Sequence, residues 1–267
     1  MSVFTAVYPV GHPDPNIEVP DPASIVTNLG SAAEKRHRDA VEISDSLMKN
    51  RFSCRYYLPE PVPQKIIEEI IDAARCSPSG NNMQPWEKVY CISGAMKDAI
   101  SREMMQAHQE APDAYSAQYL YYPAGPIPPE YARRRFEFGK HHYAPLHIDH
   151  GDLKGRARVS MRNYDFYGAP VAFIFTINNA LTQGSWLDVG YFLQSMNIGA
   201  RARGLETISQ EAPAKYQLIL RKNLPISDNE VVALAMGIGY PDLDKVGQFS
   251  AKQPKREVSD IIEFFGF

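Results

Sequence analysis

The sequence predicts an α+β or α/β protein in which a single sheet is wrapped by helices. Three stretches support this fold class: an amphipathic pattern in residues 61–80, a continuous apolar run in residues 169–177, and a long apolar pattern in residues 186–205. The first and third have the spacing of helices, and the second is typical of a strand buried on both faces. The length of 267 residues is compatible with one large domain or two small ones.

Helices are expected in residues 31–50, in residues 61–80 with Pro63 in the first turn and Ser77-Pro78 as the stop, and in residues 186–205. In the first, Val41, Ile43 and Leu47 lie roughly on one side of the predicted helix. The second carries one apolar stripe, formed by Ile66, Ile67, Ile70, Ile71 and Ala74. The third is expected to end at Gly204, because glycine is the residue that most often ends a helix in a left-handed conformation.

Strands are expected in "EKVYCIS" (87–93), in "APVAFIFTI" (169–177) and in "EVVALAMGIGYPD" (230–242). Between the first two lies a segment, residues 104–166, that is rich in Tyr, Pro, Arg and His and has weak periodicity. The first 30 residues carry five prolines with little apolar periodicity, which predicts an extended arm. We therefore divide the chain into a proline-rich extension, residues 1–40, and a folded domain, residues 41–267.

Composition excludes several classes of protein. The net charge of −3 and the pI of about 6.2 give no basic footprint, so a nucleic-acid partner is not expected. No apolar run approaches the about 20 residues that cross a bilayer, and the N-terminal residues lack a basic leader, so neither a membrane segment nor a secretory signal is expected. The three cysteines, Cys54, Cys76 and Cys91, form no C-x-x-C pair, which favours a reducing compartment and a cytoplasmic protein.

The stretch "RFSCR", residues 51–55, is the first candidate for binding. In extended chain Arg51, Ser53 and Arg55 share a face, where two guanidinium groups and a hydroxyl would suit a phosphate or carboxylate. A solvated basic turn explains the same pattern. A second basic cluster, Lys252, Lys255 and Arg256, would either complete an anion site or serve as solubilising charge.

The stretch "SPSGNNMQPW", residues 77–86, has more backbone-exposing residues than a turn requires. It offers backbone amides at Ser79 and Gly80 and side-chain amides that include Asn82. Such groups recognise carbonyl oxygens and ring nitrogens rather than phosphate charge. Trp86 is either a core anchor or a stacking platform, and the core is the commoner place for a lone tryptophan.

Metal and nucleophile chemistry have weaker signals. Four histidines and an aspartate, His141, His142, His147, Asp149 and His150, lie within ten residues but form no H-x-x-x-H or H-E-x-x-H pattern, so a structural metal is a minor alternative and no metal ligand is assigned. Cys54 is flanked by arginines that would lower its pKa, yet no Cys-His constellation accompanies it, which favours a buried thiol. No nucleotide-binding glycine motif follows a predicted strand.

Five motifs of this chain resemble the FMN-dependent nitroreductase family, in its branch of nitrobenzoate-type reductases. In chain order they are "RFSCR", "SPSGNNMQPW", "GSWLDVGYFLQSMNIGARARGLETISQ", "GIGYPD" and "KREVSDIIEFFGF". The resemblance runs from about residue 45 to the end of the chain. It implies a nitroreductase-like fold, an α/β sandwich with a central, mostly antiparallel sheet wrapped by helices, in an intertwined homodimer. The order and spacing of several motifs are more specific than any one of them.

The resemblance also implies an FMN site at the subunit interface. One chain would hold the phosphate, ribityl chain and pyrimidine edge through Arg51, the backbone of Phe52, Ser53 and Arg55, with Arg256 closing the phosphate site. The other subunit would contribute Pro78, Ser79, Gly80 and Asn82. The backbone that approaches flavin N5 and O4 would be that of Ser209, Gln210 and Glu211. Here "GLETISQEA" stands where "GLGTCPQ" is usual, which leaves the donor to N5 open.

The implied activity is the reduction of nitroaromatic compounds by NADPH or NADH, in a ping-pong hydride transfer through flavin N5 without an assigned general acid or base. The protein would position the flavin and tune its potential. Residues 104–166 would form the substrate cover, with aromatic side chains Tyr115, Tyr119, Tyr121, Tyr122, Tyr131 and Phe136. The alternatives are quinone reduction, reductive dehalogenation or flavin cleavage in the same superfamily, and a non-catalytic flavin-binding protein.

Overall fold

The structure is a computed structural model that describes the backbone of residues 34–267 and the side chains from residue 39 onward. Most of the predicted proline-rich extension therefore lies outside the described residues. Contacts divide the chain into two units, residues 1–46 and 47–267. The first described helix, α2 (Glu34–Asn50), confirms the helix predicted over residues 31–50, and its Val41 and Ile43 are exposed.

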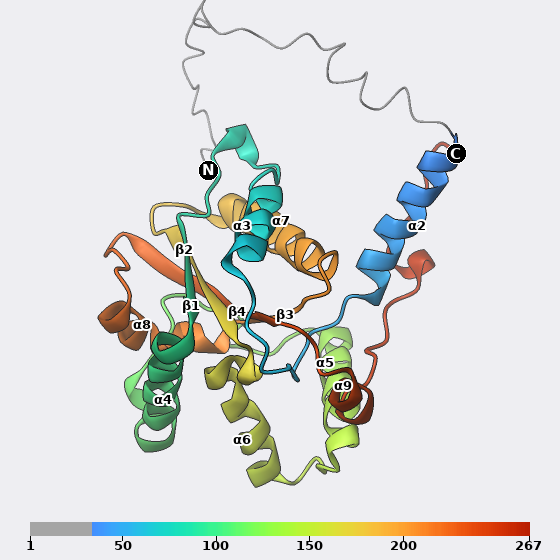
Figure 1. The fold of residues 1–267 in the computed structure, drawn as a ribbon. Helices are drawn as coiled ribbons and strands as arrows, with labels where there is room; N and C mark the ends of the chain where they lie inside the picture. Colours follow the sequence, from blue (N-terminus) through green and yellow to red (C-terminus); the bar gives the residue numbers. More distant parts are fainter. Residues whose placement is uncertain (1–33) are drawn as a thin grey trace, which may run out of the picture. The chain divides into compact units, whose positions relative to one another are not determined.

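The second unit is built on a four-stranded sheet in the order β1-β2-β4-β3 (Figure 1). Its strands are β1 (Lys88–Ser93), β2 (Val171–Asn178), β3 (Glu206–Gln210) and β4 (Glu230–Gly239), and every neighbouring pair is antiparallel. This confirms the mostly antiparallel sheet and three predicted strands. The sequence did not predict β3 as a strand, because its five residues include only one apolar side chain, Ile208.

Helices cover both faces of this sheet. On one face α3 (Gln64–Ala74) and α7 (Gln183–Arg201) pack against alternate residues of β2, including Phe173 and Phe175. On the other face α4 (Gly94–Glu110), α8 (Gln217–Asn223) and the 3-10 segments η4 (Arg162–Gly168) and η5 (Ala212–Tyr216) pack against Ala172 and Ile174. Burial on both faces explains the continuous apolar run that the sequence shows at β2.

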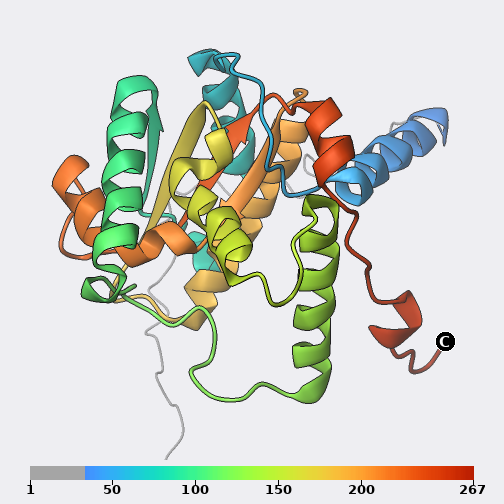
Figure 2. The same ribbon diagram turned by 90° about the horizontal axis from the view of Figure 1, so that it is seen from below.

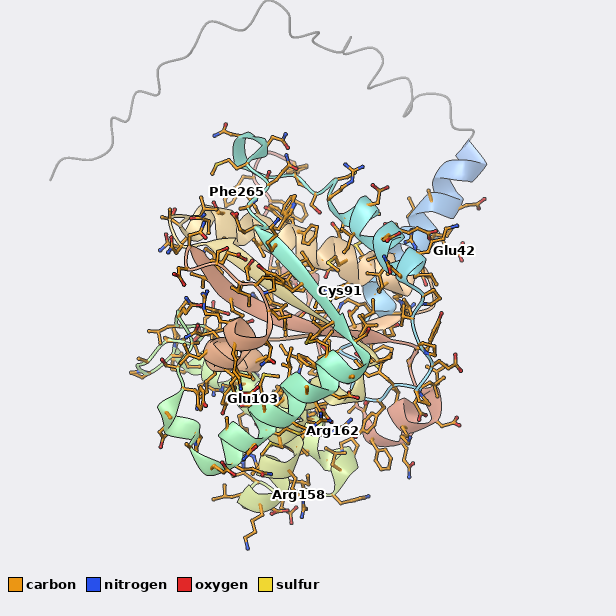
Figure 3. All side chains as sticks on the ribbon, turned by 60° about the vertical axis from the view of Figure 1, so that its left-hand side comes forward. Glu42, Cys91, Glu103, Arg158, Arg162 and Phe265 are labelled. Atoms are coloured by element: carbon orange, nitrogen blue, oxygen red, sulfur yellow. The ribbon has the colours of Figure 1, made fainter. Side chains whose placement is uncertain are left out.

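Figure 3 looks onto β1 and α4, on which Cys91 and Glu103 are labelled. A salt bridge of 2.5 Å between Glu103 and Lys222 joins α4 to α8. Three more helices complete the unit: α5 (Pro129–Tyr143), α6 (Leu153–Met161) and α9 (Leu243–Phe249). The 3-10 turn η3 (Ala144–Leu146), which follows α5, contacts α9, and Figure 2 shows the chain running on from α9 to the C terminus.

The segment of weak periodicity, residues 104–166, is more helical than the sequence indicated. It contains the end of α4 and all of α5 and α6. The sequence did not predict α5 and α6, because neither helix carries a clear apolar stripe. Helix α5 buries no residue, and α6 buries only Gly155. Of the aromatic residues assigned to a substrate cover, Tyr115 and Tyr119 pack against the core, whereas Tyr121, Tyr122, Tyr131 and Phe136 are exposed.

A buried carboxylate, Glu230, lies at the start of β4 and accepts several hydrogen bonds. Its Oε1 accepts hydrogen bonds from the Ser227 backbone N–H and the Tyr90 hydroxyl, both at 3.0 Å, and its Oε2 accepts one from the Thr176 hydroxyl. Burial by itself would raise the pKa of the Glu230 carboxyl, but the hydrogen bonds to the carboxylate outweigh burial and hold the pKa below its ordinary value. The stabilisation is therefore present above pH 4.5 and is lost as the pH falls through the folded-state pKa.

We expect Glu230→Gln to flatten the dependence of stability on acid, because glutamine keeps the shape but does not titrate in this range. Urea unfolding from about pH 6 to about pH 3 measures this dependence. Wild type should lose more unfolding free energy over that range than the variant does. Equal losses in the two proteins would show that Glu230 does not contribute to acid sensitivity.

Candidate functional site

The predicted binding segment, residues 51–55, lies along the edge strand β3. Ser53 forms a parallel bridge with Thr207, and the Cys54 N–H donates to the Thr207 carbonyl at 2.9 Å. This pairing brings "RFSCR" next to "ETISQ", so the structure joins two of the sequence motifs that were predicted to share a site. Arg55 and Gln210 therefore belong to neighbouring stretches of chain although they are 155 positions apart in the sequence (210 − 55).

The side chains of this segment differ in burial. Cys54 is fully buried, and its Sγ donates to the Tyr56 carbonyl at 3.1 Å. Burial raises the pKa of Cys54 to about 11, so the thiol stays protonated at neutral pH and the buried-thiol interpretation holds. Arg51, Phe52, Ser53 and Arg55 are all half-buried, so Cys54 is the one fully buried residue of this segment.

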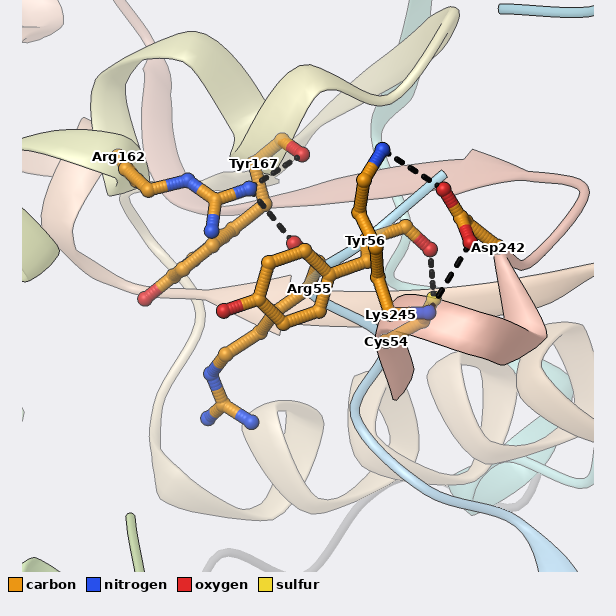
Figure 4. Close-up of polar contacts among 7 residues, drawn as sticks. All are labelled: Cys54, Arg55, Tyr56, Arg162, Tyr167, Asp242 and Lys245. Carbon is orange, nitrogen blue, oxygen red and sulfur yellow. Dashed lines mark hydrogen bonds and ion pairs between the residues drawn. The ribbon is translucent and has the colours of Figure 1, made fainter. Parts of the chain in front are cut away.

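Arg162, at the start of η4, fixes this segment from the side (Figure 4). Its Nη2 donates to the carbonyl oxygens of Arg55 at 2.6 Å and Tyr167 at 3.2 Å. Its guanidinium also lies over the rings of Tyr56 and Tyr167, at 4.8 and 5.2 Å from their centroids. Sequence reasoning missed Arg162, because it stands in no motif and its role arises only from the packing of η4.

Four buried polar atoms of residues 51–55, η4 and β3 lack hydrogen-bond partners within the described part of the chain: Arg55 Nε, Asp165 Oδ1, Glu206 Oε2 and Gln210 Oε1. The Arg55 guanidinium points away from Arg162 (Figure 4); its Nη1 donates to the Ser53 carbonyl at 3.2 Å, but its Nε has no partner. Gln210 donates from Nε2 to the Asn163 carbonyl at 2.9 Å, while its Oε1 accepts nothing. Buried groups of this kind are costly unless a ligand or water satisfies them. A polar ligand with both acceptors and donors fits here.

Helix α5 adds a histidine close to this region. Burial lowers the pKa of His142 to about 4, and the positive charge of Arg55 lowers it as well. The imidazole, which stacks on Phe138 at a centroid distance of 5.4 Å, is therefore neutral at neutral pH. The sequence marked His142 only as a minor metal candidate. Among the described residues, no group of three or more His, Cys, Asp or Glu side chains is arranged to hold a metal ion.

The loop "SPSGNNMQPW" is attached to α7. The Gly80 N–H donates to Asp188 Oδ2 at 3.1 Å, and the Ser77 hydroxyl donates to the Ser195 hydroxyl at 2.8 Å. Asn81 and Asn82 both adopt positive φ, which asparagine tolerates better than most residues. After the loop, Trp86 stacks on Phe192 of α7 with ring centroids 4.8 Å apart, which confirms its role as an anchor.

The loop reaches α7 at two places. Gly80 contacts Asp188, and Ser77 contacts Ser195. Ser195 lies two positions before Asn197, whose Oδ1 accepts a hydrogen bond of 2.6 Å from Thr207, the bridge partner of Ser53. Among the described residues, no hydrogen bond joins the loop residues Pro78, Ser79, Gly80 and Asn82 to Arg51, Ser53 or Arg55.

Arg256 lies on the exposed C-terminal tail. Its Nη2 donates to the Asp260 carbonyl, and it lines a cavity of about 690 Å³ together with Arg133 and Arg134 of α5. Arg51 and Arg55 do not line this cavity. In this structure the two arginine clusters thus stay separate.

A second cavity, of about 300 Å³, opens where β3 ends. Glu211 lines it with several aromatic residues, including Tyr119, Tyr122 and Tyr164, and with Lys215. Burial raises the pKa of the Glu211 carboxyl. The cavity thus combines aromatic walls with one acid and one amine directly after Ser209 and Gln210.

None of the helices in the described range is both long and apolar enough to span a bilayer. The profile of the Nitroreductase family matches residues 48–240, which is most of the chain. The C-terminal tail that carries Arg256 lies beyond the matched range.

Two relatives share much of this sequence. The chain is 37% identical over 223 residues to a 4-nitrobenzoate reductase of Pseudomonas putida, which covers 84% of this chain and 96% of the relative. It is 31% identical over 198 residues to a chloronitrobenzene nitroreductase of Comamonas testosteroni, and this match covers 74% of this chain and 86% of the relative. Among solved structures, an FMN and NADPH-dependent nitroreductase from sphigopyxis sp. strain HMH matches with a TM-score of 0.79 and 27% identity, over 84% of this chain and 99% of that chain.

Proposed function

This chain belongs to the nitroreductase family, and we propose that it is a homodimeric, FMN-dependent oxidoreductase of the cytoplasm that reduces nitroaromatic compounds with NADPH. The observation that carries the proposal is the pairing of residues 51–55 with β3, which leaves a buried donor of Arg55 and a buried acceptor of Gln210 without partners. A flavin offers ring nitrogens, carbonyls and a phosphate to such groups. The three free cysteines are compatible with the cytoplasm.

The chain's own residues would bind and orient the cofactor. Arg51, Ser53 and Arg55 hold the phosphate, ribityl chain and pyrimidine edge, with the Phe52 backbone beside them, and Arg162 keeps this segment in place through the Arg55 carbonyl. The backbone of Ser209, Gln210 and Glu211 lines the reactive edge. The chemistry that FMN supplies is two-electron hydride transfer between the nicotinamide and the nitro group. A guanidinium at the pyrimidine edge favours the reduced, anionic form of the cofactor.

Several features of the α7 surface support a second copy of the chain as the partner. Leu187 and Tyr191 are 69% and 55% exposed, and they lie next to Asp188, which holds Gly80. The packing of its own chain does not require a glycine at position 80, because a Cβ there would meet only Asp188 Oδ2, at 3.8 Å, among the described atoms. In the proposed dimer this face presents Pro78, Ser79, Gly80 and Asn82 to the cofactor of the partner. The exposed tail with Arg256 closes the phosphate site on assembly.

Spectroscopy and turnover test this proposal. The purified chain should be yellow with bound FMN, lose its flavin absorbance on anaerobic addition of NADPH, and recover it when 4-nitrobenzoate is added, with a hydroxylamine product. Parallel assays with NADH, nitrobenzene, a quinone and an iodinated phenol define the specificity and test the alternative flavin reactions. A protein that stays colourless with added FMN would contradict the proposal.

A further inference from the structure

A line of three side chains in contact, His108, Tyr216 and Tyr164, leads from α4 to the cavity at the end of β3. His108 Nδ1 lies 2.7 Å from the Tyr216 hydroxyl, and the Tyr164 side chain packs against both residues. The Tyr164 and Tyr216 rings meet edge-on, with centroids 5.0 Å apart and an interplanar angle of 82°. The imidazole of His108 packs on the Tyr164 ring, with ring centroids 4.6 Å apart.

The two ends of this line differ in their surroundings. Tyr216 is fully buried and Tyr164 is 5% exposed, whereas His108 is half-buried and reaches the surface. At the inner end Tyr164 lines the cavity of about 300 Å³ beside Glu211. Glu211 directly follows Ser209 and Gln210, the residues proposed to lie at the reactive edge of the cofactor. The line therefore connects the protein surface with the place where substrate would react.

Nitro reduction requires a proton from outside. A nitro group, one NADPH and one proton give a nitroso group, NADP⁺ and water: the hydride supplies two electrons, one N–O bond breaks, and two hydrogens leave with the oxygen as water. Reduction of the nitroso group to hydroxylamine consumes a second NADPH and a second proton. Because the hydride and the proton differ in origin, a closed site needs a path for protons from solvent.

We propose that His108, Tyr216 and Tyr164 form this path and relay protons from solvent to the cavity beside Glu211. The inference rests on the proposed function and assigns to it a proton source. Tyr164 is the group that gives the proton to the substrate; Tyr216 and His108 act through it as positioning and reloading residues. No residue of this line belongs to the motifs that the family resemblance quotes.

Proton balance is maintained along the line. A proton enters at His108, the imidazole passes one to Tyr216, Tyr216 passes its own to Tyr164, and Tyr164 releases one into the cavity. Each group ends with the number of protons it began with, and the hydroxyl hydrogens then rotate back. The groups that face His108 are Tyr164 and Tyr216, and Lys215 acts on it electrostatically. Burial lowers the pKa of His108, and the charge of Lys215 lowers it further, so the imidazole releases a proton readily.

The same cluster offers a matched control. The Tyr115 ring packs on Tyr216 at a centroid distance of 5.0 Å, as close as the Tyr164 ring does. Its hydroxyl has no hydrogen bond to the line in the described structure. Removing the Tyr115 hydroxyl therefore tests for effects of ring packing, and removing the Tyr216 hydroxyl tests the relay.

The experiment compares Tyr216→Phe and Tyr115→Phe with wild type as FMN-loaded proteins. Stopped-flow absorbance separates reduction of bound flavin by NADPH from its reoxidation by 4-nitrobenzoate. We expect Tyr216→Phe to slow reoxidation by about 10–100-fold, to change the solvent deuterium isotope effect on it, and to leave reduction by NADPH unchanged. His108→Ala should slow the same step, and added imidazole should restore it. Tyr115→Phe should match wild type.

A structural readout accompanies the kinetics. In the FMN-free protein, NMR titration of His108 should show a pKa that shifts in Tyr216→Phe but not in Tyr115→Phe, because only the former loses the hydrogen bond to Nδ1. If wild type reduces 4-nitrobenzoate but Tyr216→Phe reoxidises at the wild-type rate with the same isotope effect, the relay is overturned and the proposed function stands. If wild type neither binds FMN nor reduces the substrate, both proposals fail.

Discussion

Replacing Arg51 and Arg55 together by alanine is expected to weaken FMN binding by roughly 3–6 kcal/mol, because two charge-assisted hydrogen bonds at about 1.5–3 kcal/mol each are lost. This corresponds to a rise in Kd on the order of 10²–10⁴-fold. Both side chains are half-buried beside β3, so water only partly replaces the cofactor's contacts with them. Fluorescence titration of the FMN-free variant with FMN measures the loss.

The matched control is Arg75→Ala. It also removes a positive charge, but Arg75 is an exposed residue that pairs with Asp72 just beyond α3. We expect its FMN affinity to equal that of wild type. Circular dichroism and thermal unfolding establish that the double variant is folded. A folded double variant that binds FMN as tightly as wild type would contradict the assignment of this segment.

The second large effect is expected from Gly80→Trp. Position 80 is outside the left-handed region, and a Cβ there would meet only Asp188 Oδ2, at an ordinary contact distance of 3.8 Å, so the substitution should be compatible with the fold. In the proposed dimer the same side chain would enter the cofactor site of the partner. The variant should therefore fold, form dimers and lose nearly all bound FMN.

Gly80→Ala provides the control for this variant, since its Cβ would make only an ordinary contact with Asp188. It should retain most of the cofactor. The ratio of absorbance at the flavin band to that at the protein band, read after gel filtration, gives the occupancy. Full occupancy in a folded Gly80→Trp dimer would show that the loop does not reach the cofactor.

The sequence predicted those parts of the fold in which one residue pattern determines the structure. The stripe that includes Ile67, Ile70 and Ala74 is buried in α3, and the apolar run of β2 is buried on both faces. Trp86 anchors the loop as expected. Where burial is sparse the pattern disappears: α4 buries Lys97 and Ser101 among its few core residues, and α5 buries none. A short, polar edge strand such as β3 likewise carries little periodic signal.

The candidate site likewise has parts that the sequence predicted and parts that it did not. Local sequence indicated that residues 51–55 would suit either an anion site or a solvated basic turn, and that residues 77–86 have more backbone-exposing residues than a turn requires. It did not show that Ser53 pairs with Thr207, because that register depends on the closed sheet. Arg162, His142 and the line from His108 to Tyr164 stand in no motif; their positions follow only from the packing of η4, α5 and α4 around the core. Such long-range contacts have no signature in a single sequence.

In the proposed dimer two chains share each FMN site, one through Arg51–Arg55 and the other through its Pro78–Asn82 loop. The most direct measurement is the FMN content of purified heterodimers, made by co-expressing the Arg51→Ala, Arg55→Ala chain with the Gly80→Trp chain under different affinity tags. If the sites are shared, one site of the heterodimer combines the altered residues 51 and 55 of one chain with the altered residue 80 of the other. The second site combines the unaltered segment and the unaltered loop. Each heterodimer should therefore hold one FMN, although either parent homodimer holds almost none. If each site is built from a single chain, both sites of the heterodimer carry a defect, and heterodimers without FMN would contradict the account.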